Sequence, residues 1–137
     1  MDVRLDEATM QKSGRPIQGG AHDRNGAGTA RQDYRTRWGM NLVWAIMRIP
    51  FHLWPGHHLR LPIGLELSLK ATLAHTLKVP YRSRSALARR IVDHVAAALP
   101  TRAIRVATDG GYAPQAFVRD LPGNVNGVGR CLRTAQL

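Results

Sequence analysis

Short apolar stretches, bounded by glycine, proline and charged residues, alternate with polar segments along the chain. Residues 41–49 form a compact apolar run with valine and isoleucine, which is typical of a buried strand. The sequence PGHH at 55–58 predicts a turn, and the alternating apolar positions of 59–67 predict the second strand of a hairpin. Pro62 has no backbone N–H to donate, so this second strand is expected at a sheet edge or to begin at the proline.

The N-terminal part of the chain has little apolar periodicity. Residues 3–5 predict a short strand that ends at Asp6, and residues before Met1 would be needed to give it an ordinary length. Residues 13–37 are rich in glycine, arginine, aspartate and glutamine, which predicts a long, polar and mobile loop. The pattern of residues 68–82 is ambiguous.

An amphipathic helix is predicted from Ser83 or Ser85, either of which can cap its start, to about Leu99. Its apolar positions recur every three or four residues, at Leu87, Ala88, Ile91, Val92, Val95 and Leu99. The rest of the chain predicts a strand at 103–108, a helix at 113–121 entered through a Gly-Gly turn, and a strand at 124–130.

A hairpin early in the chain and alternating strands and helices late in it indicate one α/β domain, with a mixed sheet and flanking helices. The length of 137 residues suits a single domain with a modest core. The chain stops seven residues after Arg130 with no further predicted element, so we expect an incomplete domain.

The charge is strongly unbalanced towards basic residues. Lysine and arginine number 20 against 9 aspartates and glutamates, which gives a formal net charge of +11. Such a surface favours polyanionic partners, because each neutralised phosphate releases counterions. A GC-rich genome would explain arginine in place of lysine better than it explains the shortage of acidic residues. Nucleic acid is therefore the expected partner.

The sequence contains neither a secretory signal nor a membrane span. Its N-terminus is charged, and the longest apolar run, 41–54, is too short and is interrupted by Arg48 and Pro50. Cys131 is the only cysteine, which excludes an intramolecular disulfide and a cysteine-based zinc site. We expect a cytoplasmic, nucleoid-associated protein without membrane contact.

Two aspartates lie where predicted strands end, Asp6 after VRL and Asp109 after AIRVAT. Ligands of α/β sheets bind beyond the carboxyl ends of strands. If the two strands are neighbours, both carboxylates would converge on a site suited to Mg²⁺ or Mn²⁺, which prefer hard oxygen ligands. The alternative is that each aspartate is a turn or helix-cap residue, especially Asp109 before Gly-Gly.

Several basic residues are candidates for DNA contact. Trp38 lies beside two arginines and can stack or contact phosphate with them, and other arginines gather at the start of the predicted helix and after the last strand. For the arginines at the start of the helix a solvated face is the alternative to phosphate contact. The candidates are Arg35, Arg37, Trp38, Arg82, Arg84, Arg130 and Arg133.

Four segments, in order, resemble the catalytic domain of DDE-type insertion-sequence transposases. The stretch LDEATMQKSGRPIQGGAHDR resembles the family's first catalytic-aspartate block, with Asp6 at the aspartate. The hairpin region from Trp38 and the helix before residue 103 are similar to those that follow it. The stretch IRVATDGGYAPQAFVRDL then resembles the second catalytic-aspartate segment, with Val106, Asp109 and Tyr112 in the family's pattern.

The resemblance implies a ribonuclease-H-like fold and metal-dependent cleavage and joining of DNA at transposon ends. It implies Asp6 and Asp109 as catalytic metal ligands for Mg²⁺ or Mn²⁺, DNA as partner, and a homodimer with intact transposase. The family's third carboxylate belongs to a later helix past Leu137, and Ala8 intervenes where the family has threonine directly after its acidic pair. We therefore expect a fragment that is inactive alone.

Two other interpretations remain open. The chain can be a non-catalytic, basic DNA-binding protein, or a basic α/β domain unrelated to transposition. The second would be favoured if Asp6 and Asp109 lay far apart, because carboxyl groups more than about 8 Å apart cannot share two metals spaced about 3.5–4 Å.

Overall fold

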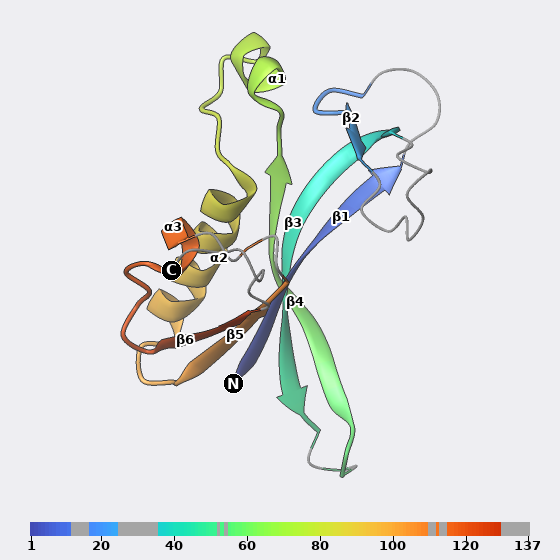
Figure 1. Ribbon diagram of the computed structural model, residues 1–137. Coiled ribbons are helices and arrows are strands. Elements are labelled where there is room, and N and C mark those ends of the chain that lie inside the picture. The colour runs from blue at the N-terminus through green and yellow to red at the C-terminus, as the bar shows by residue number, and fades with distance from the viewer. Residues whose placement is uncertain are drawn as a thin grey trace.

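The computed structural model describes residues 1–11, 17–24, 36–51, 53, 55–109, 112 and 115–129, with the backbone alone at residues 23, 24, 36, 37, 115 and 116. These residues form one six-stranded mixed sheet with helices on one side (Figure 1). The strands are β1 Asp2–Gln11, β2 Ala21–Arg24, β3 Thr36–Pro50, β4 His58–Ser68, β5 Ile104–Thr108 and β6 Val125–Gly129. The sheet order is β2-β3-β1-β5-β6, and β4 also pairs with β3. The prediction of an α/β fold with a mixed sheet is confirmed.

The predicted hairpin is present, and its two strands extend beyond the apolar segments that predict them. β3 and β4 pair antiparallel from Asn41 opposite Ser68 to Pro50 opposite His58, with a β-bulge between Ala45 and Ile46. Pro62 lies opposite Ile46, next to this bulge. Among the described strands β4 pairs only with β3, so the predicted edge position is confirmed, although the proline is not the first residue of the strand.

The first strand does not end at Asp6 as predicted. β1 continues to Gln11, because its backbone pairs antiparallel with β3 from Asp2 opposite Arg48 to Gln11 opposite Gly39. Within it only Val3 and Leu5 are buried. The exposed second half has no apolar alternation, so no pattern in the sequence marks it as a strand.

The prediction of one long loop at 13–37 is wrong in part. Its described portion contains β2, which pairs antiparallel with β3 from Ala21 opposite Gly39 to Arg24 opposite Thr36. Residues 12–16 and 25–35 lie outside the described residues. In the ambiguous stretch 68–82, Ala71–Thr76 forms the short helix α1.

The helix predicted from Ser83 is α2, Arg84–Ala98, and the Ser83 hydroxyl caps it by accepting from the Ala86 N–H at 3.2 Å. At its other end the Asn124 side chain donates to the carbonyl of Leu99 at 3.0 Å and to those of Ala96 and Arg102 at 3.4 and 3.3 Å. These contacts satisfy carbonyls that a helix end leaves without intrahelical partners.

The C-terminal strands follow the predicted order. β5 pairs parallel with β1 and with β6, so the chain crosses over from the hairpin through α2 and returns beside the first strand. The helix predicted at 113–121 is shorter: α3 spans Gln115–Val118, and residues 113 and 114 lie outside the described residues. A turn follows α3, in which Asp120 takes the left-handed backbone conformation at φ 58°.

One face of the sheet carries the hydrophobic core. Alternate residues of the central strands pack against α2, and the segment after β5 adds Tyr112 and Phe117 to the same cluster. α2 and α3 lie on this side of the sheet (Figure 1). The buried strand residues are Val3, Leu5, Val43, Ala45, Ile104, Val106 and Val125. The opposite side, which carries the even-numbered residues of β1 and β3, is called the open face below.

Candidate functional site

The two predicted metal ligands lie on neighbouring parallel strands, Asp6 in the middle of β1 and Asp109 directly after β5. The ladder between β1 and β5 pairs Val3 with Val106 and Arg4 with Ala107. Two residues further along each strand are Asp6 and Asp109, so the register brings them to the same level of the sheet. Adjacent strands are about 4.8 Å apart. The predicted juxtaposition of the two strands is therefore present.

Asp6 lies on the open face, opposite Trp44 of β3. Its side chain is exposed, and its Oδ1 accepts a hydrogen bond from the backbone N–H of Glu7 at 2.8 Å. The second carboxylate oxygen gives Asp6 further capacity to accept a donor or a cation.

Asp109 directly follows β5 and is exposed. Its backbone carbonyl accepts from the N–H of Tyr112 at 3.2 Å, which closes a turn after the strand. Gly110 and Gly111, where a turn is predicted, lie outside the described residues.

The pKa of the Tyr112 phenol depends on its burial and on the charges of carboxylates from β1 and from the end of β5. The residue is buried, and its hydroxyl has no hydrogen-bond partner among the described residues. Burial strongly raises the pKa of this phenol, and the negative charges of Glu7, Asp109 and Asp6 raise the pKa further, while Arg84 lowers it. Carboxylates from β1 and from the end of β5 therefore act on one buried hydroxyl.

Glu7 and Tyr112 are site residues that the sequence does not predict. Glu7 follows Asp6 in a strand whose second half shows no pattern, so its proximity to Tyr112 depends on the fold. The available signal for Tyr112 is its position in the transposase-like segment, three residues after Asp109.

Two ion pairs hold the first turns of α2 against the sheet. Arg84 pairs with Glu7 at 3.0 Å, and Arg90 pairs with Glu66 at 3.4 Å. The two glutamates flank Val43, because β3 pairs with β1 on one side of this residue and with β4 on the other. Exposed pairs of this kind contribute about 0–1 kcal/mol each. Arg84, predicted as a DNA contact, thus has a structural partner.

The other predicted DNA contacts are scattered. Trp38 packs edge-on against His22, with ring centroids 5.1 Å apart, and lies against Gly20. Arg82 is exposed just before α2. The structure describes only the backbone of Arg37, and Arg35, Arg130 and Arg133 lie outside the described residues. Nothing in the described geometry brings Trp38 and Arg82 together with Asp6 as one surface.

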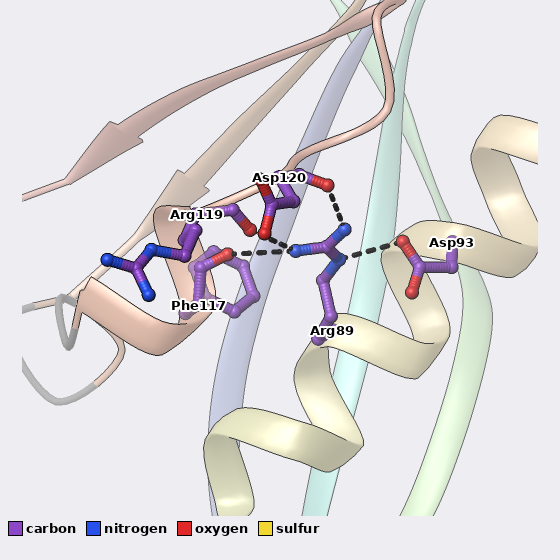
Figure 2. Close-up of polar contacts among 5 residues, drawn as sticks. All are labelled: Arg89, Asp93, Phe117, Arg119 and Asp120. Carbon is purple, nitrogen blue, oxygen red and sulfur yellow. Dashed lines mark hydrogen bonds and ion pairs between the residues drawn. The ribbon is translucent and has the colours of Figure 1, made fainter.

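Arg89 anchors the segment that follows the site. Its Nε donates to the Asp93 carboxylate at 2.8 Å, and its Nη1 donates to the carbonyls of Arg119 at 2.7 Å and Phe117 at 3.4 Å (Figure 2). Its Nη2 donates to the carbonyl of Asp120. One guanidinium therefore binds the end of α3 to α2, and α3 follows directly on the Asp109–Tyr112 turn.

The pair of aspartates fits a magnesium or manganese ion in its donor type. Both ions prefer oxygen ligands, and Mg²⁺ is commonly held by one or two carboxylates together with waters and substrate phosphates. Within the described ranges there is no cluster of three or more histidine, cysteine, aspartate or glutamate side chains placed to hold a metal. Asp6 and Asp109 would thus supply part of a coordination shell that substrate and water complete.

The unpaired hydroxyl of Tyr112 allows a direct test of its environment. Tyr112→Phe should leave the free energy of unfolding at pH 7 unchanged or higher, because it removes a buried hydroxyl without a partner. The raised pKa keeps the phenol neutral in the folded state, whereas the unfolded phenol ionises above its ordinary value near 10. Wild-type stability should therefore fall by about 1.4 kcal/mol at pH 11 through this residue alone, and the variant should lack that loss.

Urea unfolding at pH 7 and pH 11 measures both effects. Tyr81→Phe is the control, because Tyr81 is 56% exposed. A fall in stability of more than about 1 kcal/mol at pH 7 in Tyr112→Phe would show that the hydroxyl already has a structural partner.

In the part of the chain that the structure describes, no helix combines the length and apolar character needed to cross a membrane. Comparison of the chain with models of protein families, with curated proteins and with solved structures finds no match.

Proposed function

We propose that residues 1–137 are part of the catalytic domain of a DDE-type transposase, a protein that cleaves and joins DNA by metal-dependent phosphodiester chemistry. The observation that supports the proposal is the parallel pairing of β1 with β5, whose last pair, Arg4 opposite Ala107, precedes each aspartate by two residues. The two aspartates are 103 positions apart in the sequence, and each stands out in its own sequence context.

The strand order supports a ribonuclease-H-like fold as part of this proposal. β1 lies between an antiparallel hairpin on one side and a parallel strand on the other, and α2 makes the crossover between them. This arrangement leaves the middle of β1, where Asp6 lies, beside the carboxyl end of β5, which supports a pair of catalytic aspartates on these two strands.

The residues have distinct roles in the proposed chemistry. Asp6 and Asp109 supply carboxylate oxygens for Mg²⁺ or Mn²⁺, which when bound would activate a water or 3′-hydroxyl and offset charge on the phosphodiester. The Tyr112 hydroxyl makes no hydrogen bond to either aspartate among the described residues and takes no part in this assignment. The basic surface contacts DNA phosphates without strong sequence preference.

We expect no DNA nicking by this chain alone. The resemblance implies a third carboxylate, and Glu66, the one glutamate besides Glu7, lies on β4 in an ion pair with Arg90. A supercoiled plasmid incubated with Mg²⁺ or Mn²⁺ should remain at background nicking. Robust nicking that is lost in Asp109→Ala would contradict the expected inactivity.

Metal binding tests the site without requiring activity. Mn²⁺ titration followed by electron paramagnetic resonance should show one site of weak affinity, and Asp109→Asn or Asp6→Asn should reduce that affinity about tenfold or more, as loss of a metal's ligand environment does. Asp93→Asn is the matched control, since Asp93 pairs with Arg89 on α2. Equal binding by Asp109→Asn and Asp93→Asn would refute the assignment.

A non-catalytic DNA-binding protein is the second candidate. The open face favours it, because exposed arginines of several strands meet there. DNA binding without any Mn²⁺ binding at Asp6 and Asp109 would select this second function.

A further inference from the structure

The open face has a hollow that the predicted DNA contacts do not include. Its volume is about 520 Å³, and it is lined by Arg4, Asp6, Trp44, Ile46, Arg48 and Arg60. Three of these six residues are arginines from three different strands, and Asp6 belongs to the candidate metal site. Trp44 and Ile46 add an apolar surface between the charged groups. The hollow is therefore continuous with the proposed catalytic end of the sheet.

The strand register aligns the arginines in a row across the sheet. Arg48 on β3 lies directly opposite Arg60 on β4 and, on its other side, opposite Asp2 on β1. Asp2 in turn is level with Arg105 on β5. Arg4 lies two residues further along β1, which corresponds to about 6.6 Å. Arg60, Arg48 and Arg105 thus lie in one row across the open face, with Asp2 between the last two. Arg4 lies beside this row, on the side nearer to Asp6.

The opposition of Arg48 and Arg60 costs stability in the free protein. Like charges directly opposite each other on an antiparallel pair are destabilising. Nη2 of Arg48 is 3.0 Å from Nδ1 of His58, and Asp2, opposite Arg48 on β1, is the acidic residue beside the two arginines. An anion lying between the two arginines would remove the repulsion.

We propose that this arginine row, Arg4, Arg48, Arg60 and Arg105, binds the phosphate backbone of DNA. Guanidinium groups bind phosphate oxygens in a bidentate geometry, and successive phosphates of one strand provide a linear array of charge. Asp2 and Asp6 are the acidic residues on this stretch of the face, so the row carries a net positive charge. The identity of the polyanion as DNA rests on the proposed function, whereas the location of the surface rests on the register and the hollow alone.

The row would also orient the substrate of the proposed reaction. A strand that follows the arginines from Arg60 past Arg4 reaches Asp6 in the lining of the same hollow. Backbone phosphates held in this way bring one phosphodiester to Asp6 and to the carboxyl end of β5. The arginines act as positioning residues, because they contact phosphates beside the reacting one.

The test compares two variants that remove equal charge. Arg48→Gln/Arg60→Gln removes the opposed pair, and Arg102→Gln/Arg119→Gln removes two exposed arginines that do not line the hollow. Binding of a labelled 30-bp duplex is measured by fluorescence anisotropy in EDTA, at several salt concentrations. Loss of two phosphate contacts should lower the salt slope by about 1.8 and weaken binding at about 50 mM salt by more than roughly tenfold.

The free energy of unfolding provides a second readout. Arg48→Gln/Arg60→Gln should be as stable as the wild type or more stable, because the cross-strand repulsion is gone. Weaker binding together with unchanged or raised stability would support a phosphate-binding role and exclude damage to the fold.

Three outcomes would overturn the proposal: equal weakening of DNA binding by both double variants, no duplex binding by the wild type at the lowest salt concentration, or a dependence on Arg48 and Arg60 seen only with anionic phosphatidylserine vesicles. Because the experiment contains EDTA, it does not depend on the metal site. If the wild type binds no Mn²⁺ but binds DNA through these arginines, the catalytic proposal is refuted. The assignment of the arginine row as a DNA-binding surface then still holds.

Discussion

Replacing Arg89 by alanine should lower the free energy of unfolding by about 2–4 kcal/mol, because hydrogen bonds from a charged donor contribute more than neutral ones. The variant loses the bond to Asp93 and leaves the carbonyls of Phe117, Arg119 and Asp120 without this donor (Figure 2). Denaturant unfolding followed by circular dichroism measures the change.

The adjacent arginine supplies the control. Arg90 lies on the same helix, is more exposed than Arg89, and forms an ion pair with Glu66 at 3.4 Å. Arg90→Ala should cost less than about 1 kcal/mol. The stability cost of Arg89→Lys should lie between those of Arg89→Ala and Arg90→Ala, because an ammonium group lacks the planar guanidinium geometry that reaches several carbonyls. Equal effects of Arg89→Ala and Arg90→Ala would contradict the anchoring role.

Gly64→Ala should destabilise the protein by about 1–3 kcal/mol through overpacking. A β carbon at this position would lie 2.5 Å from Cγ2 and 3.3 Å from Cγ1 of Ile91, a buried residue of α2. The helix therefore approaches β4 at a distance that only glycine permits. Since α2 also makes the crossover to β5, a shift of the helix would disturb the alignment of β5 with β1.

A double-mutant cycle identifies the cause of this effect. In an Ile91→Ala background the added methyl group has space, so Gly64→Ala should cost almost nothing there, and the coupling should be of the order of 1–3 kcal/mol. Gly123→Ala is the control, because nothing lies within 4 Å of the position that its added β carbon would occupy. Identical costs of Gly64→Ala in both backgrounds would exclude the contact with Ile91 as the reason.

The elements that sequence reasoning predicts best are those with a one-sided apolar pattern. α2 shows helical periodicity and a serine cap, and β3 and β5 are compact runs of apolar residues. The second half of β1 is exposed, and it is a strand because the β3 backbone lies beside it. Local sequence does not contain that information, since the partner is about 30 positions away.

The candidate site is predictable to the same limited extent. Asp6 and Asp109 stand out because each comes near the end of an apolar strand segment, and the parallel pairing of their strands follows from a helix-containing crossover. The contribution of Glu7 and Tyr112 depends on side-chain burial after folding. No spacing between them in the sequence indicates it.

The arginine row depends on an irregularity of the sheet. Before the β-bulge Trp44 pairs with Leu65, and after it Arg48 pairs with Arg60. Without the extra residue at the bulge, Arg48 would lie opposite Leu61. A shift of one residue changes which side chains share a face, and such bulges follow from tertiary packing more than from local sequence.

The sharing of one divalent metal ion by Asp6 and Asp109 is tested most directly by a crystal of this chain soaked in Mn²⁺. We expect an anomalous difference peak at about 2.0–2.2 Å, a typical distance for hard cations of this size, from a carboxylate oxygen of each aspartate. A well-ordered site with no peak between the two carboxylates, or with the only peak elsewhere on the protein, would contradict the shared metal site.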